Sequence, residues 1–157
     1  MNKVIMPQFA ALAGLLENDH IVLKMRVASK AALLADLAHR AASYTGLAET
    51  SLRGSLTARE ALGSTGFGAG IAMPHARIIG LTDPFALFVQ LSRPIPFDAI
   101  DGLPVDLVFM LLSPAASEGT HLAVLAAISR RLRDKDVADR LRKAKSPVEV
   151  LRVVVEI

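Results

Sequence analysis

Apolar positions follow the period of a strand at first and the period of a helix further along the chain. Apolar and polar residues alternate over residues 20–27, which predicts a first strand. From Lys30 to Thr45 apolar residues recur every three or four positions, which predicts a helix that Ser29 caps and Gly46 ends. The positions expected to face the core are Leu33, Leu34, Leu37, Ala38 and Ala41.

A second helical pattern covers residues 49–62, and Leu52, Leu56 and Leu62 are expected to face inward. The pattern breaks down at residues 63–70, where four of eight residues are glycines. Glycine-rich sequence without a hydrophobic period predicts a loop.

Two longer apolar runs, at residues 85–91 and 105–112, predict strands that are buried on both faces. Helices are expected over residues 121–133, with Thr120 as the cap, over residues 136–144, and from Pro147 to Val154. Helices that alternate with buried strands indicate an α/β fold. We expect a single domain over residues 1–157, with a central mixed sheet of about five strands and helices on both faces.

The composition excludes several classes of protein. Of 157 residues 52% are hydrophobic and the net charge is only +3, so the chain as a whole is not disordered. The absence of cysteine excludes a disulfide scaffold and a thiolate zinc site. With six Phe, one Tyr and no Trp, the chain has few rings on which bases or sugars would stack.

The first residues lack the apolar stretch of a secretory signal, because Pro7 interrupts them and charged residues follow at Glu17 and Asp19. No uncharged apolar run reaches the length of a membrane helix. We therefore expect a soluble, cytoplasmic protein without membrane insertion.

Basic residues gather in one stretch, from Arg130 to Lys145, where eight basic side chains are interleaved with three acidic ones. Such a stretch is typical of the solvated face of two helices. A second interpretation is that it docks an acidic partner protein. Nucleic acid is not expected as a partner, because no nucleic-acid motif accompanies the stretch and aromatic residues are few.

The glycines do not have the pattern of a nucleotide site. A P-loop needs Gly-Lys-Ser/Thr, and residues 63–70 contain no lysine. A dinucleotide fingerprint leads into a helix, whereas this stretch leads to Pro74. Tight turns, or a close approach of the backbone to another group or a site, remain as reasons for these glycines.

His75 stands where the glycine-rich stretch returns to the apolar sheet. Pro74 has a fixed φ and favours extended geometry in the preceding residue, so this stiff segment would hold the His75 ring in one orientation. If a backbone carbonyl accepts a hydrogen bond from one ring nitrogen, the other is free as a nucleophile. A structural histidine is the alternative.

His121 is the second candidate, because it is expected in the first turn of a helix, where the positive end of the dipole favours a neutral ring and an anion. Packing at a helix start is its alternative role. Arg59 has a guanidinium suited to phosphate oxygens, although its spacing alone does not place it beside His75. His20 and His39 are expected to be surface or boundary residues.

The stretch from residue 63 to residue 75, GSTGFGAGIAMPH, resembles the active-site signature of the fructose/mannitol-type (type 2) enzyme IIA domain of the phosphoenolpyruvate-dependent phosphotransferase system. The resemblance extends over nearly the whole chain and includes PIPFDAIDGLPVDLVF at residues 94–109. Residues 59–66, REALGSTG, are most similar to the nitrogen-regulatory branch. Ala69 and the pair Ala76-Arg77 depart from that branch, which usually has Asn and Gly-Lys there.

The resemblance implies a regulatory phosphocarrier rather than a conventional turnover enzyme. His75 would accept a phosphoryl group from an HPr-like carrier protein, His121 would hydrogen-bond the phosphate or the reacting ring, and Arg59 would balance the charge. The phosphorylation state would decide which target proteins bind, with residues 130–145 as one docking surface. No cofactor or metal is implied.

Two alternatives stay open from the sequence. One is a fructose/mannitol-specific enzyme IIA component that passes phosphate to an enzyme IIB domain for sugar uptake. The other is a binding module without chemistry, which would form no phosphohistidine.

Overall fold

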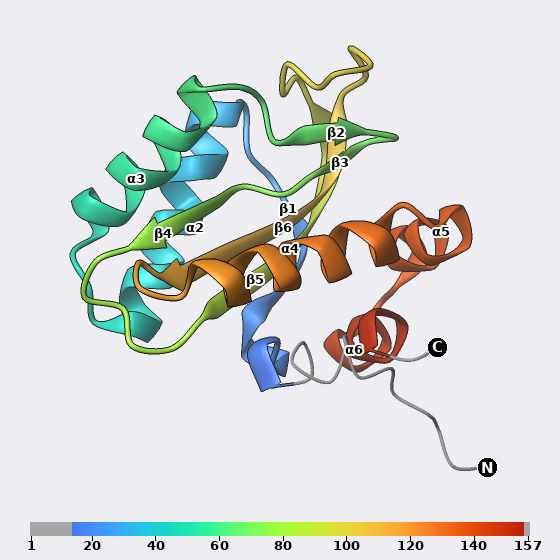
Figure 1. The fold of residues 1–157 in the computed structure, drawn as a ribbon. Coiled ribbons are helices and arrows are strands. Elements are labelled where there is room, and N and C mark those ends of the chain that lie inside the picture. The colour runs from blue at the N-terminus through green and yellow to red at the C-terminus, as the bar shows by residue number, and fades with distance from the viewer. Residues whose placement is uncertain (1–13, 156–157) are drawn as a thin grey trace.

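A computed structural model describes residues 14–155, and their strands form one sheet (Figure 1). The strands are β1 (Ile21–Met25), β2 (Gly66–Gly68), β3 (Ile71–Ala72), β4 (His75–Ile78), β5 (Phe85–Ile95) and β6 (Val105–Pro114). The helices are η1 (Asn18–His20), α2 (Lys30–Thr45), α3 (Glu49–Ala61), α4 (Glu118–Leu132), α5 (Lys135–Lys143) and α6 (Pro147–Val155).

The sheet is organised around β6. The strand order is β1-β5-β6-β3-β2, and β4 also pairs with β6. Strand β5 runs antiparallel to β6, whereas β3 and β4 run parallel to it and β1 runs parallel to β5. The expected mixed α/β sheet is confirmed, with six strands in the described residues instead of about five.

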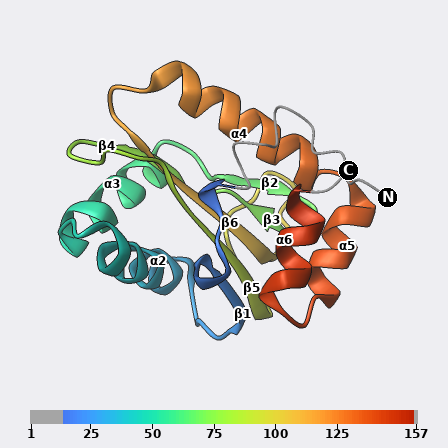
Figure 2. The same cartoon turned by 90° about the horizontal axis from the view of Figure 1, so that it is seen from below.

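Helices cover both faces of the sheet. Figures 1 and 2 show α2 and α3 on one face and α4, α5 and α6 on the other. Alternate residues of β5 and β6 point to the two faces, so Phe88 and Phe109 pack with α4–α6, whereas Leu87 and Met110 pack with α2 and α3. Both strands are therefore buried on two faces, as their apolar runs predict.

The ends of α2 follow the sequence signals. The Ser29 hydroxyl accepts a hydrogen bond from the amide of Ala32, and Gly46 ends the helix in the left-handed region at φ 73°.

The inward position that the sequence predicts for Leu62 is wrong. The buried face of α3 is formed by Leu52, Leu56 and Glu60. Leu62, two residues after Glu60, lies off that face and is 85% exposed.

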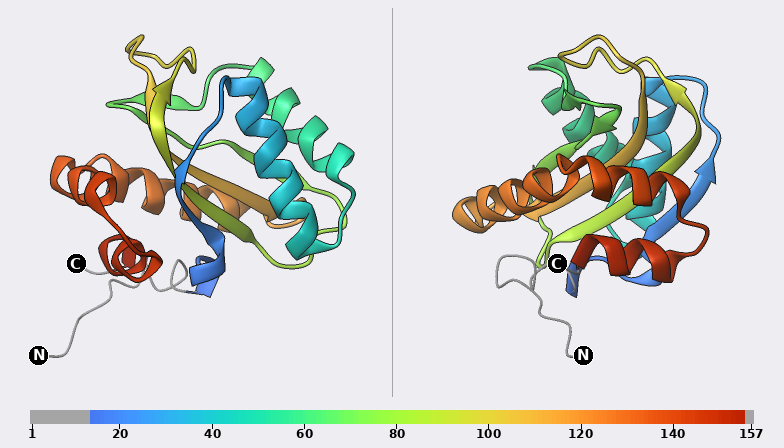
Figure 3. Two further views of the ribbon diagram at one scale, coloured as in Figure 1. Left: turned by 180° about the vertical axis from the view of Figure 1, so that it is seen from behind. Right: turned by 90° about the vertical axis from the view of Figure 1, so that its right-hand side faces the viewer.

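The glycine-rich stretch is not only a loop, because β2 and β3 form an antiparallel hairpin within it. A Cβ on Gly66 would lie 2.9 Å from the Cβ of Ala99, so the hairpin needs glycine to pack against the connection between β5 and β6. Figure 3 shows the hairpin and this connection side by side at one end of the sheet. The amide of Ile100 donates to the carbonyl of Gly66 there.

Three further boundaries differ from the pattern. His20 belongs to η1, and β1 begins one residue later. Strand β5 continues to Ile95, four residues beyond the apolar run that ends at residue 91. Helix α4 begins at Glu118, so Thr120 lies inside it and is not its cap.

Among the described helices, none is long and apolar enough to cross a membrane. The expectation that the chain carries no secretory signal rests mainly on residues 1–13, which lie outside the described part.

Candidate functional site

His75 is the first residue of β4, and the backbone on both sides of it is fixed. The amide of Met73 donates to the carbonyl of Thr65, and the amide of Leu111 on β6 donates to the carbonyl of Pro74. His75 itself pairs with Leu111 in the parallel register. The stiffness expected from Pro74 is therefore reinforced by the sheet.

The hydrogen bonds of the His75 ring define its tautomer. Nδ1 lies 2.8 Å from the carbonyl oxygen of Met73. A carbonyl only accepts, so Nδ1 carries the proton and the neutral ring has its lone pair on Nε2. Arg59 Nε donates to that Nε2 over 3.3 Å.

The His75 ring is held in its neutral form. Burial lowers its pKa, and the positive charge of Arg59 lowers it further. The hydrogen bond to Met73 and the carboxylate of Glu60 act in the opposite direction. Burial prevails, so at neutral pH Nε2 keeps a lone pair that can attack an electrophile.

His121 lies beside His75, with ring centroids 5.6 Å apart. It is the fourth residue of α4, and its amide already donates to the carbonyl of Ser117, so it is not one of the free amides at the helix start. Its pKa is lowered by burial first, then by His75 and Arg77. The neutral ring expected from the sequence is therefore kept neutral mainly by burial.

Arg59 lies in the last turn of α3 and reaches the glycine-rich stretch as well as the ring. Its Nη1 donates to the carbonyl of Gly63 over 2.9 Å, while its Nε donates to His75. The structure thus brings Arg59, His75 and His121 together, which sequence spacing did not establish.

These three side chains line one pocket of about 550 Å³. The glycines from 66 to 70 are not part of its lining. Arg77 also lines the pocket, and its Nη2 donates to the carbonyl of Ala115. The lining residues are Ser55, Ala58, Arg59, Leu62, His75, Ala76, Arg77 and His121.

The buried carboxylate of Glu60, which the sequence analysis does not single out, links the segments that surround this site. Glu60, next to Arg59, accepts hydrogen bonds from the amide and the hydroxyl of Thr65. Lys30 Nζ lies 2.8 Å from Glu60 Oε2 and also donates to the carbonyl of Phe97. The end of α3, the start of the hairpin and the start of α2 are tied together in this way.

The tip of the hairpin is held by two other segments. The amide of Ala69 donates to the carboxylate of Asp101, and its carbonyl accepts from Arg142 of α5. Arg142 also forms a two-pronged pair with Asp106. Ala69 has φ 57°, a left-handed conformation that Asn tolerates better than Ala, which gives a physical reason for Asn at this position of the branch.

The other two histidines stand apart from the pocket. The ring of His20 packs against Tyr44 and Phe85, and its Nδ1 lies 3.1 Å from the carbonyl of Leu15. His39 is exposed and pairs with Glu49. Neither lines the pocket of His75.

The basic stretch from Arg130 to Lys145 is not uniformly a solvated face. Arg131 donates to the carbonyl of Val153, and Arg142 is bound to Asp106. The exposed members are Arg130, Arg133, Lys135, Arg140, Lys143 and Lys145.

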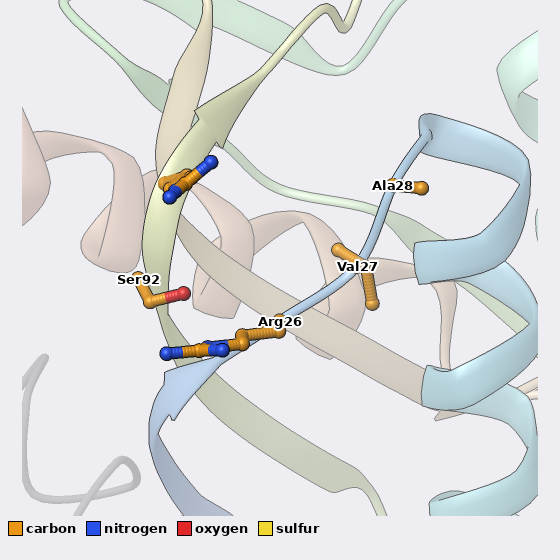
Figure 4. Close-up of a pocket in the computed structure, with 5 residues that line it drawn as sticks. Arg26, Val27, Ala28 and Ser92 are labelled. Atoms are coloured by element: carbon orange, nitrogen blue, oxygen red, sulfur yellow. The ribbon is translucent and has the colours of Figure 1, made fainter.

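A second pocket lies between the end of β1 and β5. Figure 4 shows Arg26, Val27 and Ala28 on the connection from β1 to α2, with Ser92 on β5 beside them. It shares no lining residue with the pocket of His75 and contains no histidine or carboxylate. Within residues 14–155, no three histidine or carboxylate side chains converge to hold a metal ion.

Comparison with solved structures defines the class of fold first. Enzyme IIA mannitol from Escherichia coli superposes with a TM-score of 0.74 at 21% identity, over 89% of this chain and 99% of that one. The nitrogen regulatory protein IIA-Ntr from Neisseria meningitidis has a TM-score of 0.89 at 35% identity, over 92% of this chain and 99% of that one. The fold is that of the enzyme IIA domains.

Residues 14–157 match the family described as the phosphoenolpyruvate-dependent sugar phosphotransferase system, EIIA 2, and the chain belongs to that family. It is 41% identical over 143 residues to a nitrogen regulatory protein of Bradyrhizobium diazoefficiens, covering 91% of this chain and 94% of the relative. The resemblance inferred from the sequence, including its nitrogen-regulatory branch, is confirmed. Proteins of this family bind phosphoryl donor and acceptor proteins.

Proposed function

We propose that this chain is a regulatory phosphocarrier of the nitrogen-related phosphotransferase system and that His75 accepts the phosphoryl group on Nε2. The observation that carries the site assignment is the pair of hydrogen bonds on the His75 ring. Met73 fixes the proton on Nδ1 and leaves the Nε2 lone pair in a pocket beside an arginine. We take residues 1–157 as one such domain, working in the cytoplasm.

The proposed donor is a phosphohistidine on an HPr-like carrier protein. The Nε2 lone pair of His75 attacks phosphorus in line, a new N–P bond forms, and the N–P bond to the donor imidazole breaks with its electron pair returning to that ring. Nδ1–H stays in place, so the phosphorylated ring is cationic, and its bond to the carbonyl of Met73 stabilises that charge. One N–P bond replaces another, so the step needs little more than positioning and charge stabilisation.

Arg59 occupies the Nε2 lone pair before transfer and is well placed to move onto the phosphate afterwards. Its guanidinium carries further N–H groups for the equatorial oxygens of the transferred group. His121, with its ring centroid 5.6 Å from that of His75, supplies a neutral hydrogen bond to the same group.

The rim of the pocket suits a protein donor. Leu62 lines the pocket and is 85% exposed, and Leu122, which follows His121 in the sequence of α4, is 61% exposed. Exposed apolar side chains beside a polar centre are typical of a protein–protein contact. A carrier protein that covers them would also exclude water from the transfer.

Phosphorylation would change the surface that target proteins meet. A phosphoryl group adds about −1.5 to −2 charges and three acceptor oxygens. Added beside Leu62 and Leu122, it favours partners with a cationic contact surface and disfavours apolar ones. The exposed basic side chains between Arg130 and Lys145 are a second proposed surface, for an acidic regulatory partner.

The test uses a phosphorylated HPr-like protein as donor and follows the label on this chain. Wild type and His39→Gln, which alters an exposed histidine outside the pocket, should both be labelled. His75→Gln should take up no label. Equal labelling of His75→Gln would overturn the site assignment.

A sugar-uptake role is the second candidate, because the family includes sugar phosphotransferase components. The labelled protein is mixed with a fructose- or mannitol-type enzyme IIB domain. Transfer of the label to that domain at a rate comparable with carrier-to-IIA transfer would replace the regulatory function with the sugar-uptake function.

A further inference from the structure

Behind His121 lies a hydroxyl that no step of the proposed transfer uses. Ser113 is on β6 and is 2% exposed, and His121 on α4 is 6% exposed. Ser113 Oγ and His121 Nδ1 are 2.6 Å apart, within the range of a strong hydrogen bond. The two side chains are therefore hydrogen-bonded to each other in the protein interior.

The direction of this hydrogen bond follows from what else the hydroxyl can reach. Among residues 14–155, Ser113 Oγ has His121 Nδ1 as its one hydrogen-bond partner. If Nδ1–H donated to Oγ, the hydroxyl proton would be buried without an acceptor, which is costly. If the hydroxyl donates to Nδ1, both the hydroxyl proton and the Nδ1 lone pair have a partner.

We infer that Ser113 is a positioning residue that fixes His121 as its Nε2–H tautomer, so that Nε2–H donates to the phosphoryl group on His75. The use of that hydrogen bond rests on the proposed function. The tautomer itself does not, because it follows from Ser113 and His121 in the unphosphorylated protein.

The rings of His75 and His121 then have opposite tautomers, and each tautomer is set by the group that is hydrogen-bonded to Nδ1 of that ring. The carbonyl of Met73 places the proton of His75 on Nδ1 and the lone pair on Nε2. The hydroxyl of Ser113 places the lone pair of His121 on Nδ1 and the proton on Nε2. His75 Nε2 is thus ready to accept the phosphoryl group, and the neighbouring His121 Nε2–H is ready to donate a hydrogen bond to its oxygens. Neither ring has to exchange a proton during transfer.

Nitrogen-15 NMR of the histidine rings tests the inference in unphosphorylated protein at a pH where both rings are neutral. His121 should show a protonated Nε2 and an unprotonated Nδ1. In Ser113→Ala the Nδ1 loses its donor, and the Nδ1–H form should become populated. Ser113→Thr and Ser113→Val are a matched pair of nearly the same shape, and only the threonine variant should keep the wild-type tautomer.

Transfer kinetics supply the second readout. The label should still arrive at His75 in Ser113→Ala and Ser113→Val, but about two- to tenfold more slowly, as expected for one neutral hydrogen bond. Wild-type His121 protonated on Nδ1, or a tautomer unchanged in both hydroxyl-free variants, would overturn the inference. A shifted tautomer with an unchanged transfer rate would overturn the positioning role alone. Failure of wild type to be labelled on His75 would refute the proposed function and leave the tautomer result standing.

Discussion

Removal of Arg59 should have two separate effects on His75. The guanidinium donates to Nε2 over 3.3 Å in the resting state, and its charge disfavours the imidazolium form. Without it, the pKa of His75 should rise toward the ordinary histidine value, because an unfavourable positive neighbour is lost. The phosphoryl group would at the same time lose a cation that offsets its charge.

The kinetic effect follows from the exposure of the site. Loss of one preorganised donor in a water-excluded site costs about 100- to 1000-fold in rate. Arg59 is only half-buried and its pocket is open to solvent, which weakens its electrostatic effect. We therefore expect Arg59→Ala to slow transfer about 10- to 100-fold, equivalent to about 1.4–2.7 kcal/mol.

The assay combines rapid-quench transfer from the phosphorylated carrier with an NMR titration of His75. Arg59→Lys keeps the charge and lacks the forked donors, so it should keep the pKa low and restore part of the rate. Arg53→Ala is the control, because Arg53 is on the same helix but lines the groove between α2 and α3. If Arg59→Ala left both the pKa of His75 and the transfer rate at their wild-type values, the role assigned to this contact would be refuted.

Three further predictions concern stability, and urea unfolding measures each. Ala69→Gly should stabilise the protein by about 0.5–1 kcal/mol, because relief of a left-handed alanine exceeds the added backbone entropy of the unfolded chain; a lower midpoint would contradict this. Glu60→Gln should destabilise it by about 2–3 kcal/mol, because the buried carboxylate loses its charge beside Lys30 and weakens its hold on Thr65; an unchanged midpoint would count against the network. Burial lowers the pKa of His75 and His121 in the folded protein. Below about pH 6.5 the unfolded chain therefore binds more protons at these histidines than the folded protein does. The free energy of unfolding should fall as the pH is lowered from about 7 toward 5. The double variant with Gln at both positions should lose part of that slope, and an unaltered slope would exclude these two histidines as its source.

The sequence predicts the parts of the fold whose signals are local. Ser29 and Gly46 mark the ends of α2 because a hydroxyl cap and a left-handed glycine act within one turn. The inward position expected for Leu62 is wrong because the spacing of Leu52 and Leu56 continues at Glu60, so the apolar side chain of Leu62 is off the buried face. The hairpin was missed because its strands have two and three residues and contain glycines, too few to show an alternation.

The same distinction between local and long-range signals applies to the residues of the candidate site. His75 was identified from Pro74 and the glycines that precede it, all adjacent in the chain. Glu60 carries no sign in the sequence that it is buried, since it follows Arg59 on a helix and is buried only when the hairpin folds against it. Ser113 ends an apolar run, and its contact with His121 exists only once α4 crosses back over β6.

Long-range proton–phosphorus NMR correlation on the phosphorylated protein tests the central claim most directly. It locates the phosphorus on one nitrogen of one ring. Phosphorus on Nε2 of His75, with Nδ1–H retained and still bonded to the carbonyl of Met73, is the predicted result. Phosphorus on Nδ1 of His75, or on any other residue, would contradict the account.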